Sequence, residues 1–134
     1  RADEGRLERH RQALRGGQVQ QIVVTAEVTA ITDDGLVARL ERGFNRGSAL
    51  FSDGDAVRVE YGALTFEARA LGRESFRYLR AAEQPLDVDV VCLFENFDAP
   101  VTVTVIGLAG GLGRMLREQA PARLRLVKTV AGRE

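Results

Sequence analysis

The chain has little of the chemistry on which most enzyme and metal sites depend. Its 134 residues include one cysteine, Cys92, and one histidine, His10, and no tryptophan. A single cysteine cannot form an internal disulfide, and one cysteine with one histidine does not supply the ligand set of a transition-metal site. Cys92 stands in the apolar run VDVVCLF, far in sequence from His10. We therefore expect a buried, inert thiol rather than a nucleophile, and no metal site.

An excess of charge of one sign is also lacking. Lys+Arg 19 and Asp+Glu 19 give a formal net charge of +0 at pH 7. A neutral domain has no general electrostatic attraction for nucleic acid or for an anionic membrane, so any basic site must be local. Aromatic residues make up only 6%, and no strand pairs them as a platform for single-stranded nucleic acid. We therefore expect no nucleic-acid partner.

Long apolar runs are missing as well. No run approaches the ~20 residues that span a bilayer, so we expect no transmembrane segment. The chain shows neither a signal peptide nor an initiator Met, and we expect it to be either a domain cut from a larger bacterial protein or a processed product. No motif assigns it to a compartment, and the cytoplasm is the default expectation. The 45% hydrophobic and 28% charged residues are typical of one globular domain with a core.

What is present is a series of short alternating segments. QIVVTAEVTAI and LVARLER flank the turn residues Thr32-Asp33-Asp34-Gly35, which predicts a hairpin. A second hairpin is predicted around Gly62, between the alternating residues 57–61 and 64–72. Further strands are predicted in LDVDVVCLFE, VTVTVIG and RLRLVKTV.

Helices are few in this pattern. ADEGRLERHRQALRGG predicts a polar N-terminal helix that ends at Gly16-Gly17. GLAGGLGRMLREQAP predicts a loop and a short helix closed by Pro121. In RESFRYLRAAEQP, Phe76 and Leu79 could face inward from either a helical turn or a short strand.

The fold class that follows is mainly β. We predict a single antiparallel β-barrel or sandwich of short hairpin strands, with an N-terminal helix and one short C-terminal helix. The expected organisation is an N-terminal helix or linker over residues 1–17 and a barrel-like domain over residues 18–134. The alternative is two small subdomains divided near residues 80–85.

Candidate catalytic groups are weak. The glycines of Gly107-Leu-Ala-Gly-Gly-Leu-Gly113 lie between a strand and a helix and could present N–H groups to a phosphate. They are not in G-x-G-x-x-G order, however, and the lysine of a P-loop is missing. The paired carboxylates of Asp53/Asp55 and Asp87/Asp89 are better explained by a turn and by the polar face of an edge strand. No base stands beside a nucleophile, so we expect neither an enzyme nor a bound cofactor.

Two separated groups of polar residues carry a family resemblance. Arg11 and Arg15 stand as R-x-x-x-R before the first strand, and a turn with Asn45, Arg46 and Ser48 follows about thirty residues later. The chain then continues as GDAVRV. This order resembles the PilZ domains, small β-barrels that in many members bind cyclic di-GMP. The resemblance covers roughly residues 11–72.

The resemblance implies a ligand site. The two arginines would grip phosphate and stack on guanine, and the candidate ligand-binding residues are Arg11, Arg15, Asn45, Arg46 and Ser48. The family turn reads D/N-x-S-x-x-G, whereas here Gly47 takes the place of the serine when Asn45 is read first. A barrel with a degenerate site that is used for protein contacts fits this departure.

Three functions remain open at the level of sequence. The leading hypothesis is a non-catalytic β-rich interaction or assembly module that binds a protein partner or forms a homo-oligomer, because strand edges can pair with other chains. The alternative is a PilZ-like receptor for a cyclic dinucleotide. The third is an enzyme that uses the loop of residues 107–113.

Overall fold

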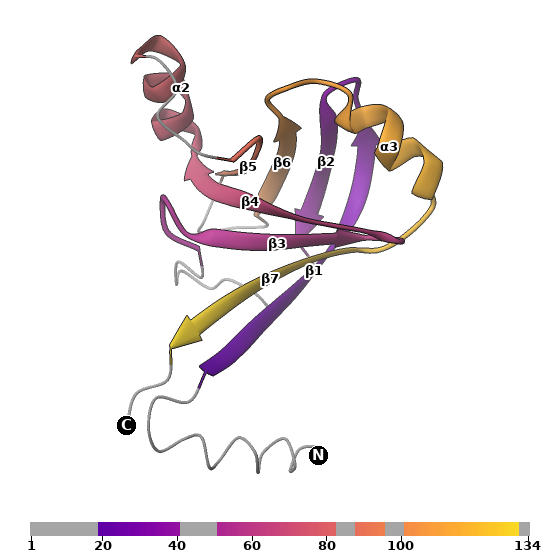
Figure 1. The fold of residues 1–134 in the computed structure, drawn as a ribbon, viewed down its shortest axis with the longest axis horizontal. Coiled ribbons are helices and arrows are strands. Elements are labelled where there is room, and N and C mark those ends of the chain that lie inside the picture. Colours follow the sequence, from indigo (N-terminus) through magenta and orange to yellow (C-terminus); the bar gives the residue numbers. More distant parts are fainter. Residues whose placement is uncertain (1–18, 41–50, 83–87, 96–100, 132–134) are drawn as a thin grey trace.

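The computed structural model describes residues 19–40, 51–82, 88–95 and 101–131 and shows a mainly β domain (Figure 1). Seven strands form one closed barrel in the order β1-β2-β6-β5-β4-β3-β7. The strands are β1 Val19–Ile31, β2 Gly35–Leu40, β3 Ala56–Tyr61, β4 Leu64–Gly72, β5 Val90–Glu95, β6 Thr102–Gly107 and β7 Leu124–Ala131. The helices among the described residues are α2 Arg73–Ala82 and α3 Leu112–Gln119. The mainly β class is confirmed, and its form is a barrel rather than a sandwich.

Both predicted hairpins are present. β1 and β2 pair antiparallel, and the Thr32 N–H donates to the Gly35 carbonyl at 2.8 Å to close their turn. β3 and β4 pair antiparallel around Gly62, whose φ of 62° lies in the left-handed region that glycine adopts without strain. The predicted N-terminal helix lies outside the described residues.

One strand pair corrects the antiparallel prediction. β4 and β5 are parallel neighbours, from Arg69 opposite Val91 to Gly72 opposite Phe94. Parallel neighbours need a crossover, because a tight turn cannot bring the chain back to the same end. The segment RESFRYLRAAEQP, which the sequence left undecided between helix and strand, contributes to this crossover. It contains α2, which follows β4 directly and was not part of the predicted fold class. The strands before and after residues 80–85 therefore belong to the same barrel.

The barrel interior is filled by small and branched apolar side chains. The strand predicted in VTVTVIG is present as β6, and Val101, just before it, Val103 and Val105 are all buried. α3 closes the end of the barrel next to the β1–β2 turn, with Leu112 and Leu116 in the core. At the other end of the strands, the rings of Phe51 and Phe94 stack with centroids 4.7 Å apart.

A second apolar cluster lies outside the barrel. Leu71, Val91 and Leu93 are buried there, and Phe76 and Leu79 of α2 pack over them. β5 is therefore covered on both faces. This explains the unbroken apolar run VVCLF, which is typical of a strand without a solvent face.

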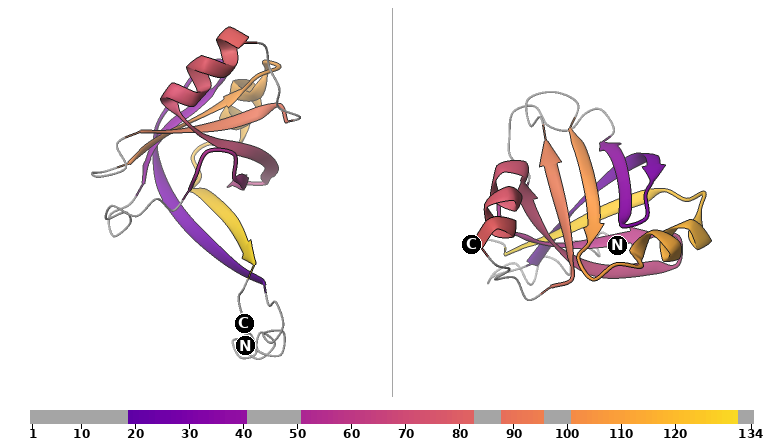
Figure 2. Two further views of the ribbon diagram at one scale, coloured as in Figure 1. Left: turned by 90° about the vertical axis from the view of Figure 1, so that its left-hand side faces the viewer. Right: turned by 90° about the horizontal axis from the view of Figure 1, so that it is seen from above.

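β1 and β7 continue past the barrel as a two-stranded ribbon (Figures 1 and 2). We call this ribbon the arm and define it as residues 19–23 of β1 paired with residues 127–131 of β7. β2 pairs with β1 only from Ala26 onward, and β3 pairs with β7 only as far as Val127. None of the described helices is long and apolar enough to cross a membrane.

Candidate functional site

The ligand site that the resemblance implied lies outside the described residues. Arg11, Arg15, Asn45, Arg46 and Ser48 all fall within residues 1–18 and 41–50, which the structure does not describe. The structure therefore neither assembles nor separates these side chains. After Ser48, the described residues begin at Phe51 and lead through the turn of residues 52–55 into β3.

Asp53, the first carboxylate of that turn, has a structural role. Asp53 accepts a hydrogen bond from the Gly72 N–H at 2.5 Å and another from the hydroxyl of Ser75. Gly72 and Ser75 flank the start of α2, where backbone N–H groups have no partner within the helix. Asp53 thus ties the loop before β3 to the beginning of the helix.

The second carboxylate forms an ion pair. Asp55 lies 2.8 Å from the Lys128 ammonium and accepts the Ser52 N–H at 2.8 Å. Burial raises the pKa of the Asp55 carboxyl, but the hydrogen bonds from Lys128 and Ser52 outweigh it, so the pKa lies below its ordinary value. The reading of Asp53-Gly-Asp as a turn is confirmed, since the Asp55 N–H also donates to the Ser52 carbonyl at 3.0 Å.

The glycine loop before α3 packs closely against the β1–β2 turn. The Gly113 N–H donates to the Asp33 carbonyl at 3.1 Å, and the Gly107 N–H donates to the Asp34 carbonyl at 2.8 Å. A Cβ atom on Gly113 would come within 2.0 Å of the Thr32 carbonyl oxygen. Close contact with the backbone of the β1–β2 turn therefore accounts for Gly113 without a phosphate, and the Leu112 side chain, 2.7 Å from a Cβ on Gly107, accounts for Gly107.

Cys92 is buried, as the sequence predicted. It is 0% exposed inside the barrel, and desolvation raises the pKa of its thiol to about 12. A thiol that stays protonated and covered is not a nucleophile. Within the described ranges, no group of three or more His, Cys, Asp or Glu residues could hold a metal ion.

An open groove lies where β1 separates from β7. The β1–β7 ladder ends at the pair Ala26 and Leu124. If the same register continued, Thr29 would lie opposite Pro121, which has no backbone N–H to donate. Thr29 is also the extra residue of a β-bulge, since Val28 pairs with Ala38 and Ala30 with Val37. Proline on one side and a bulge on the other separate the two segments.

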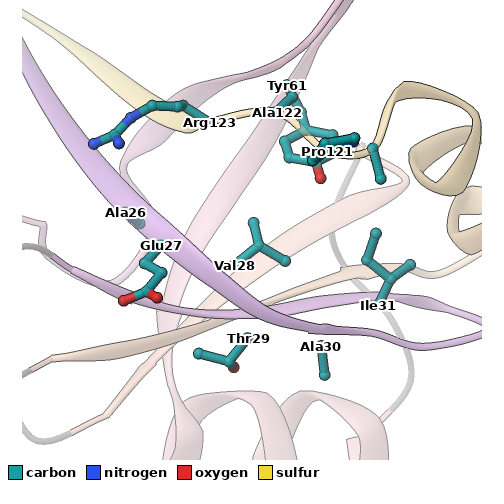
Figure 3. Close-up of a pocket in the computed structure, with 11 residues that line it drawn as sticks. Ala26, Glu27, Val28, Thr29, Ala30, Ile31, Tyr61, Pro121, Ala122 and Arg123 are labelled. Atoms are coloured by element: carbon teal, nitrogen blue, oxygen red, sulfur yellow. The ribbon is translucent and has the colours of Figure 1, made fainter.

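The groove is lined by both apolar and polar residues. It has a volume of about 590 Å³ between residues 26–31 of β1, Tyr61 and residues 120–123. Glu27 and Arg123 lie at one end, and Ile31 and Pro121 lie toward the other (Figure 3). This volume falls within the range of ~300–1,000 Å³ that is usual for binding sites.

The far wall of the groove is held in place by α3. The Gln119 side-chain oxygen accepts the Ala63 N–H at 2.8 Å, which joins the end of α3 to the β3–β4 turn. The near wall is fixed by the β1–β2 ladder and by the Thr29 hydroxyl, which donates to the Val37 carbonyl at 3.2 Å. Each wall of the groove is thus joined to a neighbouring element by hydrogen bonds.

Sequence reasoning did not find this groove. The signals that could have revealed it are the unusual length of β1, 13 residues against 8 for β7, and the proline just before β7. The chain matches no protein-family model, no curated protein and no solved structure.

Proposed function

We propose that this domain is a non-catalytic interaction module that binds an extended peptide of a partner protein in the groove beside β1. The observation that carries the proposal is the partner change of β1 at Ala26. Before that residue β1 pairs with β7, and after it β1 pairs with β2 alone among the described strands. Residues 27–31 therefore have β2 on one side and the groove on the other.

A strand edge beside a groove favours an extended peptide. Main-chain hydrogen bonds to the edge supply affinity, and pockets for alternate side chains supply specificity. Five residues of β1 run roughly 16 Å, enough for a peptide of similar length to pair with them. The bulge at Thr29 limits the pairing to a short segment, so we expect affinity to come from side chains as well as from the backbone.

The walls indicate the kind of peptide. Val28 and Ile31 are half-buried on the β1 side, and Pro121 and Ala122 offer further apolar contact. Apolar side chains of the peptide would pack between them. Glu27 and Arg123 at one end would set the direction of the peptide through its polar groups.

The experiment begins with peptides selected from a displayed random library on the purified domain. Their binding is then measured by calorimetric titration to two variants. Ala30→Arg adds a long charged side chain to β1 at an exposed position that lines the groove, whereas Thr65→Arg makes the same kind of change at an exposed position of β4 outside it. The proposal expects binding to be lost in Ala30→Arg and kept in Thr65→Arg. Peptides that bind both variants as tightly as the parent would contradict it.

A PilZ-like receptor for cyclic di-GMP is the second candidate. It is supported by the small closed barrel and by the position of GDAVRV, whose last four residues begin β3. The residues that would bind are Arg11, Arg15, Asn45, Arg46 and Ser48. Titration with cyclic di-GMP at low and moderate salt tests this candidate. Micromolar binding that Arg11→Ala and Arg15→Ala abolish would support it, and the absence of heat at high ligand concentration would exclude it.

A further inference from the structure

The arm presents a strand edge on the side of β1 away from β7. Residues 19–26 of β1 pair with β7, and β2 joins only at Ala26. Among the described residues, no strand lies on the β2 side of residues 19–24. In a strand, the backbone N–H and C=O groups of alternate residues point to each side. This edge therefore offers donors and acceptors at every second residue.

The edge lacks the features that usually prevent an exposed strand from pairing with a strand of another chain. Residues 19–24 read VQQIVV and contain no charged residue, no proline and no glycine, although 28% of the chain is charged. The bulge of β1 lies at Thr29, beyond this segment. Val23 of the arm is 41% exposed. Natural edges are usually protected by charges, prolines or bulges, so this segment is suited to pair with another strand.

We propose that the partner of this edge is a second copy of the chain, joined through antiparallel pairing of the two β1 strands about a two-fold axis. The two arms would then form one four-stranded sheet in the order β7-β1-β1-β7. The contact is isologous, because the same segment is used on both sides. This inference extends the proposed interaction function to a second edge of β1, away from the groove.

Charge favours a second copy. A two-fold contact places each residue close to its own counterpart in the second copy. A charged residue on the edge would therefore be repelled by the same charge on the other chain. The uncharged residues 19–24 carry no such penalty in any register. The corresponding part of β7 contains Lys128, which is held by Asp55 at 2.8 Å. The edge of β1, rather than that of β7, can therefore pair with a second copy of itself without repulsion between like charges.

Geometry restricts the register. Directly opposite residues of an antiparallel pair have their side chains on the same face of the sheet, and side chains alternate between the faces along a strand. A two-fold axis perpendicular to the sheet therefore has to place one residue directly opposite its own counterpart. Val24 is 0% exposed and belongs to the barrel core, which leaves residues 19–23 for the contact. The centre of that segment is Gln21. An axis there places Gln21 opposite itself and Gln20 opposite Ile22 of the second copy.

The contact is small. Pairing of five residues from each chain buries less than the ~1,200 Å² of a standard interface. We therefore expect a dimer that dissociates on dilution, with a mass that rises from one chain to two as the concentration increases.

The experiment is sedimentation equilibrium of the wild-type chain and of Gln21→Lys and Gln21→Glu. Gln21 is exposed, so neither variant removes a core contact. Each variant alone places like charges opposite each other, and we expect at least about a five-fold weaker dimer. An equal mixture of the two variants places lysine opposite glutamate, and we expect the dimer to return. A wild-type chain that stays monomeric, or a mixture that does not recover, would overturn the proposal.

Thr129→Lys is the matched control. Thr129 lies opposite Gln21 on β7 and is exposed on the same face of the arm, but it is not on the β1 edge. It should leave the dimer as strong as in the wild type, and thermal melting should show that all three variants remain folded. Loss of the dimer in Thr129→Lys would mean that the arm as a whole, rather than its β1 edge, carries the contact. Binding of selected peptides should not change in the Gln21 variants, so failure at the arm and failure at the groove are distinguishable.

Discussion

Ala26 of β1 lies directly opposite Leu124 of β7, and this is the last pair of the ladder between the two strands. Both side chains are buried in the barrel core. Beyond this pair, β1 continues beside β2 while the chain before β7 turns away toward α3. The groove and the arm both result from this exchange of partners, because among the described strands β1 lacks a neighbour on one side before the exchange and on the other side after it.

The first prediction concerns Gly113. Glycine to alanine within a helix usually stabilises a protein, because alanine has the higher helix propensity. Here the added Cβ would lie 2.0 Å from the Thr32 carbonyl oxygen and 2.5 Å from that of Asp33. We expect Gly113→Ala to lower the free energy of unfolding by about 3 kcal/mol, measured by urea denaturation.

Gly110→Ala is the control for that measurement. Gly110 has a φ of +86° but nothing within 4 Å of the added Cβ, so only backbone strain applies. We expect a loss of about 1 kcal/mol. Equal losses in the two variants would show that the contact with the β1–β2 turn is not what requires glycine at 113.

The second prediction is a pH dependence from Asp55. Its pKa is lower in the folded protein than the ordinary 3.8, so the stability that it contributes is present above that value. This contribution is lost as pH falls through the folded pKa. We expect Lys128→Met to lower the free energy of unfolding by about 1 kcal/mol at neutral pH. The difference from wild type should shrink below about pH 4. A difference that is the same at pH 7 and pH 3 would contradict the ion pair as its source.

The third prediction concerns the link between the loop and α2. Asp53→Ala removes the acceptor for the Gly72 N–H and the Ser75 hydroxyl. We expect a loss of about 1 kcal/mol in the free energy of unfolding, as for other side chains that cap helices. Glu74→Ala, in the first turn of α2 and 86% exposed, should cost much less. Similar costs for the two variants would argue against a specific role of Asp53.

The fourth prediction concerns Cys92. A side chain that is 0% exposed with a pKa of about 12 should not react with a thiol reagent in the folded protein at pH 8. One thiol per chain should react after denaturation. Rapid reaction under native conditions would mean that the barrel opens at β5 on the timescale of the assay.

Much of the fold was predictable because alternation is a local signal. The residues around Gly62 and the turn of residues 32–35 identified both hairpins, and Pro121 marked the region where α3 ends. The crossover between β4 and β5 was not predictable from Phe76 and Leu79. Their apolar partners Leu71, Val91 and Leu93 lie on other elements, and only those contacts distinguish a helix from a strand there.

The groove was less accessible to sequence reasoning for a similar reason. Its walls come from residues 26–31, Tyr61 and residues 120–123, three segments that only the closed barrel brings together. The length of β1 is one indication of the groove, because a strand that is longer than the neighbouring strand β7 cannot be paired with it over its whole length. At the glycines of residues 107–113, by contrast, the sequence suggested a site for which the structure gives another explanation. They suggested a phosphate site, whereas Gly107 and Gly113 contact the β1–β2 turn.

Amide hydrogen exchange followed by NMR, with and without a selected peptide, tests whether a peptide pairs with the edge of β1. We expect saturating peptide to slow exchange at residues 27–31 of β1, where the strand edge faces the groove. Exchange on α2 and on the arm should not change. Slower exchange confined to α2 or to the arm, with residues 27–31 unaffected, would contradict peptide binding at the β1 edge.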